Sequence, residues 1–219
     1  IPDSTIFFNA DHTKSFEKVK EAVEVGYDSI TFDNSHLPLD ENIACTKEVV
    51  GYVKLVNPHI IVEGEIGFIG DGSQMRDEAP QGVQKSTVQD AVRFVQETGV
   101  DMLAPAVGNV HGIIKTGEPA LDIALIKAIK DGLRSALGRS VPLVLHGASG
   151  NSDAEIRAAI TAGISIVHIN TEIRVAWRDA LRQSLQDYLD EVAPYALLAQ
   201  SESAARAIIT KKLTLFYGN

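Results

Sequence analysis

Short runs of Val, Ile and Leu alternate along the chain with longer amphipathic stretches. The short runs are typical of strands that are buried on both faces of a parallel sheet, and the longer stretches are typical of helices. The pattern predicts strands near 5–11, 29–34, 59–65, 101–107, 141–146 and 165–170. It predicts helices near 14–25, 39–56, 87–98, 121–136, 152–162 and 171–189, and a last helix at about 198–216.

Strand–helix units in one series predict an α/β protein of the TIM (β/α)8 barrel type. Six units are visible and a barrel closes with eight, so we expect the chain to cover strands 3–8, with the first two βα units absent. An open Rossmann-type sheet is the alternative, although no G-x-G-x-x-G motif follows a strand. The sequence contains no linker that divides it. It therefore predicts a single partial barrel domain over 1–219, with a helical appendage at about 190–219.

The charge of the chain restricts its partners. The net charge is −9 and the pI is about 5.1, which argues against nucleic acid and against an acidic membrane surface. A small anionic substrate is still compatible, because local N–H groups and a metal can overcome the global field. Cys45 is the only cysteine, so no internal disulfide forms, which fits a cytoplasmic location. No apolar run approaches the roughly 20 residues of a membrane span.

Each predicted strand ends on, or shortly before, a residue with a chemically active side chain. The carboxyl ends of parallel strands point to one rim, so we expect these side chains to converge. Three imidazoles are the donor set of a catalytic zinc with one open position, and neighbouring carboxylates either orient them or hold an alternative metal position. Helix capping by the aspartates and solvated carboxylates are the simpler explanations. The residues concerned are Asp11, His12, Asp33, Glu65, His111 and His146.

The last two predicted strands lead into segments that suit a phosphate. Gly147 and Ser149 follow one strand, and Asn170 and Thr171 follow the other, just ahead of a helix. Backbone N–H groups and helix N-termini at this place in TIM barrels bind phosphate. Arg174, one turn into the helix, would add positive charge. Helix capping alone also explains Asn170 and Thr171.

Five segments, read in order from Asp11 to about Arg182, carry a resemblance to a known family. They are DHTKSFEKVKEAVEVGYDSITFDNSHLPLDENI, VEGEIG, GNVHGIIKTGEPALD, LVLHGASG and INTEIRVAW. Together they resemble the class II, zinc-dependent ketose-bisphosphate aldolases, which include fructose- and tagatose-bisphosphate aldolases. The combination is specific, whereas no single segment would be.

The resemblance implies a function and a reaction. It implies one zinc on His12, His111 and His146, supported by Asp33 and Glu65. A phosphorylated ketose similar to fructose 1,6-bisphosphate is then cleaved reversibly to dihydroxyacetone phosphate and an aldehyde, through a zinc-stabilised enediolate. Asp11 handles the proton of the aldehyde-derived hydroxyl, and Glu78 in the Gly-rich loop at 67–86 is a second acid/base.

The resemblance also implies binding partners. A monovalent cation (Na⁺ or K⁺) and the substrate phosphate are expected at Gly112, Lys115, Gly147, Ser149, Asn170 and Thr171. It implies a cytoplasmic homo-oligomer, a dimer or tetramer, with a place in glycolysis or related carbohydrate metabolism. His168 shares a strand face with Asn170, so it should point to the barrel mouth and the substrate. It stands where the family usually has Asn, which leaves the identity of the sugar open.

Two other functions fit part of the pattern. A zinc hydrolase on a TIM barrel would use the three histidines but would not need Ser149 and Asn170 to hold a phosphate. A non-catalytic phosphosugar-binding barrel would bind its ligand without turnover, and binding would survive Asp11→Asn.

Overall fold

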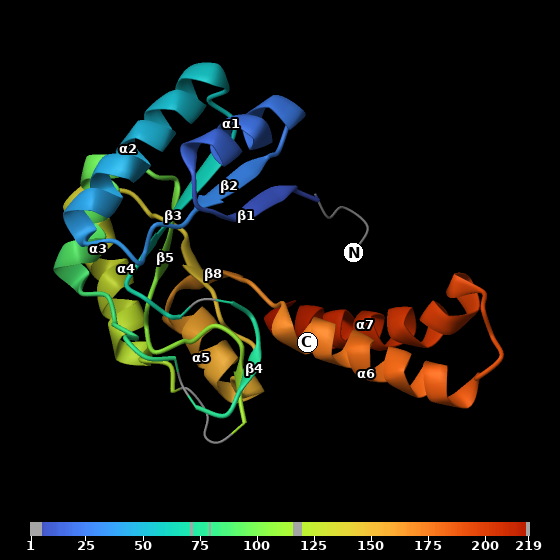
Figure 1. Ribbon diagram of the computed structural model, residues 1–219. Coiled ribbons are helices and arrows are strands. Elements are labelled where there is room, and N and C mark those ends of the chain that lie inside the picture. The colour runs from blue at the N-terminus through green and yellow to red at the C-terminus, as the bar shows by residue number, and fades with distance from the viewer. Residues whose placement is uncertain (1–5, 71, 79, 116–119, 218–219) are drawn as a thin grey trace.

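The computed structural model describes residues 6–70, 72–78, 80–115 and 120–217. Parallel strands form one curled, half-barrel sheet in this part of the chain (Figure 1). They follow one another across the sheet in sequence order, whereas a Rossmann sheet reverses its order, so the Rossmann alternative is wrong. The strands are β1 (Asn9–Thr13), β2 (Ser29–Phe32), β3 (Ile61–Ile66), β5 (Met102–Pro105), β7 (Leu143–Leu145) and β8 (Ile164–Val167).

The order of elements agrees with the prediction, but some bounds differ. The first strand begins at Asn9 and not near residue 5, which lies outside the described residues. That these strands are numbers 3–8 of a complete barrel stays a prediction.

The helices begin and end where local chemistry requires it. Ser15, Thr87 and Ser152 cap α1 (Phe16–Val25), α3 (Val88–Thr98) and α5 (Asp153–Ala162) by accepting a backbone N–H. Gly26 and Gly99 end α1 and α3 in the left-handed conformation. The first five helices lie along the outer face of the sheet (Figure 1). The helices are α1 (Phe16–Val25), α2 (Leu39–Val56), α3 (Val88–Thr98), α4 (Ile123–Leu137), α5 (Asp153–Ala162), α6 (Thr171–Asp187) and α7 (Pro194–Tyr217).

A glycine brings α3 unusually close to β3. A Cβ atom on Gly64 would lie 2.5 Å from the ring of Phe94, which is fully buried. Successive strand residues point to opposite faces, so Glu63 and Glu65 on either side of Gly64 face the concave side of the sheet. Close packing on the outer face thereby leaves two carboxylates on the inner one.

Two loops at the rim are joined by a small parallel sheet that the sequence analysis did not predict. It pairs β4 (Met75–Arg76) with β6 (Ile113–Ile114). Ile113 N–H donates to the Gln74 carbonyl at 2.9 Å. The Gly-rich loop predicted at 67–86 is therefore held to the loop that follows β5, although residues 71, 79 and 116–119 lie outside the described part.

The last two helices pair with each other and project from the sheet (Figure 1). α7 begins at Pro194, ahead of the predicted start near 198, and it also contacts α5. The predicted appendage at about 190–219 is thus mostly this helix. None of the described helices has the length and apolarity to cross a membrane.

Candidate active site

Strand β1 is irregular at Asp11 and His12. The pairing of β1 with β2 shifts register between Ala10 and Thr13. His12 in this bulge has a φ of 49°, and it is the one non-glycine residue with positive φ in the described chain. Bulges re-aim side chains. As a result, Asp11 and His12 both line the same small cavity at the mouth of the half-barrel, although they are adjacent.

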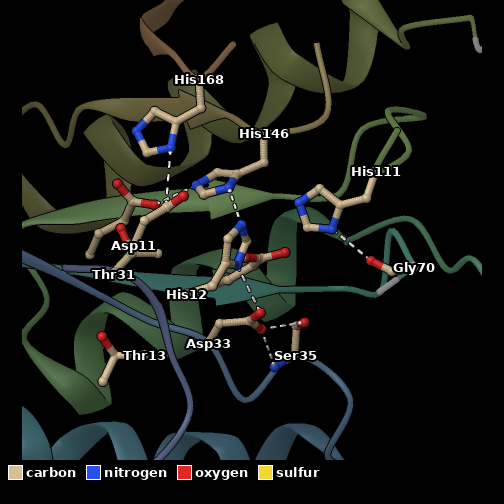
Figure 2. A network of polar contacts seen from close by, with 12 residues as sticks. Asp11, His12, Thr13, Thr31, Asp33, Ser35, Gly70, His111, His146 and His168 are labelled. Carbon is tan, nitrogen blue, oxygen red and sulfur yellow. Dashed lines mark hydrogen bonds and ion pairs between the residues drawn. The ribbon is translucent and has the colours of Figure 1, made fainter. Parts of the chain in front are cut away.

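Three histidines from different strand ends meet at this cavity (Figure 2). One ring nitrogen of each faces a fixed partner. His12 Nδ1 lies 3.0 Å from Asp33 Oδ2, and His111 Nδ1 lies 2.6 Å from the Gly70 carbonyl. His146 Nε2 lies 2.7 Å from Glu63 Oε1. Partners of this kind fix the tautomer and orientation of metal-binding imidazoles.

The other ring nitrogens fit a metal. His12 Nε2 and His146 Nδ1 are 3.2 Å apart, and a nitrogen of His111 lies within 4.8 Å of both. Two imidazole nitrogens on a tetrahedral zinc are separated by roughly 3.3 Å, from a Zn–N distance of about 2.0–2.1 Å. The three residues could therefore hold a zinc-like ion with little rearrangement.

Buried carboxylates surround the histidines. Oε2 of Glu63 and Oε2 of Glu65 are buried without a hydrogen-bond partner, and Glu65 Oε2 lies 3.6 Å from His12 Nδ1. Burial, together with the Asp33 and Glu63 carboxylates, raises the pKa of Glu65 well above its usual value. His12, Asp33 and Glu65 form a second group that could hold a cation. A positive ion at either position would relieve this concentration of buried negative charge.

Asp33 and His12 form a hydrogen-bonded ion pair. Burial opposes the charge of Asp33, but hydrogen bonds from His12 and Ser35 outweigh it and lower the pKa of this carboxyl. Burial likewise opposes the charge of His12, but its hydrogen bond with Asp33 raises the pKa of the imidazole. A metal at His12 thus competes with a proton. His111 has no such partner, and burial lowers its pKa to about 4.

Asp11 faces His168 across the cavity (Figure 2). Asp11 Oδ1 lies 3.5 Å from His168 Nδ1, and the ring of His168 lies 4.3 Å from that of His146. Burial would raise the pKa of Asp11, but His168 and His12 lower it to about 2, so Asp11 is ionised at neutral pH. Asp11 raises the pKa of His168 in turn, against the effect of burial.

The far wall of the cavity comes from the two segments predicted to hold phosphate. Gly147, Ser149, Asn170 and Thr171 line it, together with Gly112. Asn170 is the N-cap of α6, but its side chain makes no capping hydrogen bond. Gly147 has a φ of 60°, and a Cβ there would lie 2.4 Å from the Val110 carbonyl, so only glycine fits. The wall offers small side chains and a helix N-terminus, which suit an anion.

Asp33 and Glu65 lie behind His12 and do not line the cavity. Three of the residues predicted to act on the substrate also do not line it. Lys115 Nζ pairs with Asp77 Oδ1 at 2.9 Å, and Arg174 Nη1 donates to the Ser73 carbonyl at 3.4 Å. Glu78 is exposed. All three lie on or against the loops at the rim, so a movement of these loops would be needed to bring them to a substrate.

Two residues of the site were not predicted from the sequence. Glu63 holds His146, and it could have been found because it lies two positions before Glu65 and so on the same strand face. Ser73 lines the cavity from the 67–86 loop. Nothing in its sequence neighbourhood distinguishes it.

Known proteins resemble this chain over nearly its whole length. The family model "Fructose-bisphosphate aldolase class-II" matches residues 2–219. A 6-phospho-5-dehydro-2-deoxy-D-gluconate aldolase from Shouchella clausii is 40% identical over 96% of this chain and 68% of that protein. A fructose-bisphosphate aldolase from Geobacillus stearothermophilus is 35% identical over 96% of this chain and 70% of that protein. The crystal structure of the YdjI aldolase from Escherichia coli K12 has a TM-score of 0.75 and 33% identity, over 95% of this chain and 68% of that one.

Proposed function

Because the chain belongs to the class II fructose-bisphosphate aldolase family, we propose that it is a zinc-dependent aldolase acting on a phosphorylated ketose. It would cleave the ketose reversibly to dihydroxyacetone phosphate and an aldehyde. The observation that carries this proposal is the arrangement of His12, His111 and His146. Each has one ring nitrogen held by a fixed partner, while the other points to a shared position. Three imidazoles leave one position open for substrate.

The reacting carbons need both charge stabilisation and proton transfer. Zinc bound at the three histidines supplies a Lewis acid for the negative charge that develops on the substrate. Asp11, ionised at neutral pH, accepts the proton of the hydroxyl on the carbon that becomes the aldehyde. The O–H electrons form the new C=O bond, and the electrons of the broken C–C bond stay on the dihydroxyacetone phosphate fragment.

The second proton transfer is assigned to Glu78. The dihydroxyacetone phosphate fragment must receive a proton on carbon, and a carboxylic acid above the cavity supplies it. Glu78 is exposed on the 67–86 loop, so this role requires the loop to fold over the bound substrate. Closure would also keep water from the reactive fragment.

The phosphate is assigned to the wall formed by Gly147, Ser149, Asn170 and Thr171. Lys115 and Arg174 add positive charge once they leave Asp77 and Ser73. Gly112, beside His111, is assigned to the same region together with a Na⁺ or K⁺ ion. His168 contacts the ketose near Asp11 and so influences which sugar is preferred.

A second substrate is favoured by the names of several relatives. Proteins 37–40% identical over 96% of this chain are 6-phospho-5-dehydro-2-deoxy-D-gluconate aldolases. That compound and fructose 1,6-bisphosphate share a ketone next to a phosphorylated carbon, so the same wall and metal serve both. They differ at the aldehyde end, where the gluconate derivative carries a carboxylate. We propose both as substrates to be compared.

Asp11→Asn tests the proposed reaction. It keeps the size of the side chain but removes the base, so we expect kcat for cleavage to fall about 10²–10⁴-fold. Dihydroxyacetone phosphate release would be followed with both substrates, and bound metal should be unchanged. An unchanged kcat would contradict the role of Asp11. Ligand binding without turnover in the wild type would favour a non-catalytic barrel. Hydrolytic activity that survives loss of Ser149 and Asn170 would favour a zinc hydrolase.

Location and assembly complete the proposal. We propose a cytoplasmic homo-oligomer, a dimer or tetramer, that takes part in glycolysis or related carbohydrate metabolism. Light scattering of the purified protein would give the number of subunits.

A further inference from the structure

Helix α7 carries a buried lysine. Lys212 is 4% exposed, and its Nζ lies 3.0 Å from Oε1 of Glu172, at the start of α6. The neighbouring Lys211 has a side chain that is 60% exposed and pairs loosely with Asp153 at 3.4 Å. A buried ammonium is costly unless it is paired, so the position of Lys212 depends on Glu172.

Glu172 joins the two halves of the phosphate wall. Its backbone N–H donates to Ser149 Oγ at 3.4 Å. Its Oε1 accepts the N–H of Gly150 at 3.3 Å, and this is the same oxygen that contacts Lys212. One residue therefore ties the loop after β7 to the first turn of α6, whose Thr171 lines the cavity.

The position of Glu172 creates an electrostatic difficulty that Lys212 resolves. An unpaired carboxylate one residue from Thr171 would repel a phosphate dianion at the wall. The Lys212 ammonium neutralises that charge, so the N–H groups and dipole of the α6 N-terminus act on the anion unopposed.

We propose that Lys212 is a positioning residue for phosphate binding, acting through Glu172. This inference rests on the proposed function, because it takes the wall of Ser149 and Thr171 as the phosphate site. α7 is then part of the active-site architecture and not only an appendage. Replacing both members of a buried ion pair by neutral residues is often tolerated for stability, so packing alone does not require the pair of Lys212 and Glu172 to be charged.

The test compares Lys212→Met with Lys211→Met, on the same helix but at an exposed position. We expect Lys212→Met to raise KM for the phosphorylated ketose about tenfold, with kcat changed less than about threefold. Lys211→Met should match the wild type, and Lys212→Arg should restore most of the affinity. Equal KM values for Lys212→Met and Lys211→Met, or a loss confined to kcat, would overturn the proposal.

The double variant Lys212→Met/Glu172→Gln separates charge from folding. It removes both charges while Gln keeps an acceptor for Gly150, so KM should return to within about threefold of the wild type. If Lys212→Met folds, a double variant with an equally high KM contradicts the proposal. If Lys212→Met does not fold, a double variant with a KM about tenfold above the wild type contradicts it. Calorimetric titration with inorganic phosphate gives a separate readout. If the wild type cleaves no ketose, the proposed function fails, but the order of phosphate affinities among these variants still decides the role of Lys212.

Discussion

At the scale of single residues, each of the three histidines has one ring nitrogen held by a fixed partner, and this contact sets the direction of its other ring nitrogen. Asp33, Glu63 and the Gly70 carbonyl each hold one ring nitrogen, so the remaining nitrogens share one space. The partner of His12 is a carboxylate and the partner of His111 is a neutral carbonyl, so a proton competes with a metal more strongly at His12 than at His111. His12, whose pKa is raised by its hydrogen bond with Asp33, retains a proton more readily than His111, whose pKa is lowered by burial.

Glu63→Gln tests the role of the residue that sequence reasoning missed. The amide keeps the shape but weakens the hold on His146 Nε2, so we expect metal affinity to fall about 10–100-fold. A chelator competition titration measures it. Glu97→Gln is the control, because Glu97 pairs with Arg93 on the surface. Equal metal affinities in the two variants would show that Glu63 does not support the site.

The burial of His111 predicts how the stability of the metal-free protein depends on pH. Its pKa is about 4 in the folded state, lowered by burial, against 6.5 when unfolded. Between these values the unfolded state binds the extra proton, so the free energy of unfolding rises with pH. Denaturant unfolding would measure how much the free energy of unfolding falls from pH 7 to pH 5. This decrease should be roughly 1–2 kcal/mol larger in the wild type than in His111→Gln. The opposite order would mean that His111 is not buried as a neutral ring.

At the scale of elements, two rim loops act as one unit. The β4–β6 pair joins the loop that carries Glu78 to the loop that carries His111. Gly70 adds a second link, because its carbonyl holds His111 Nδ1. A change that separates the loops should therefore affect the proposed metal site as well as the proposed closure of the 67–86 loop.

Gly112→Ala tests this link. Gly112 has a φ of 97°, and an added Cβ would lie 2.1 Å from the Gln74 carbonyl. Gly138→Ala is the control, because Gly138 has a φ of 66° with no atom within 4 Å of the added Cβ. Both should lose about 1–2 kcal/mol of stability from the left-handed conformation. Only Gly112→Ala should lose more than about 1–2 kcal/mol of stability and also bind metal more weakly. Identical metal affinities in the two variants would argue against the link between the loops.

At the scale of the whole molecule, the curled parallel sheet explains why distant residues meet. His12 and His146 are far apart in sequence, yet their nitrogens lie 3.2 Å apart because both follow strands that end at the same rim. This convergence was predictable from the sequence, since the carboxyl ends of parallel strands always share a rim. The same rule brought Asn170 and Thr171 to the cavity.

Other features could not be predicted for physical reasons. β4 and β6 are two residues each, too short to give a period. The bulge at His12 depends on backbone geometry that no side-chain pattern encodes. Lys212 looks like any helix-surface lysine in sequence, and only the packing of α7 against α5 and α6 buries it. Glu63 is the exception, because its spacing from Glu65 was visible but was not used.

The most direct test of the central claim is metal content measured together with cleavage. The purified protein would be assayed before and after chelator treatment, with fructose 1,6-bisphosphate and 6-phospho-5-dehydro-2-deoxy-D-gluconate. The account predicts about one zinc per chain, loss of cleavage when the chelator removes it, and recovery when zinc is returned. A protein that binds no metal, or that cleaves either substrate equally well after complete metal removal, would contradict it.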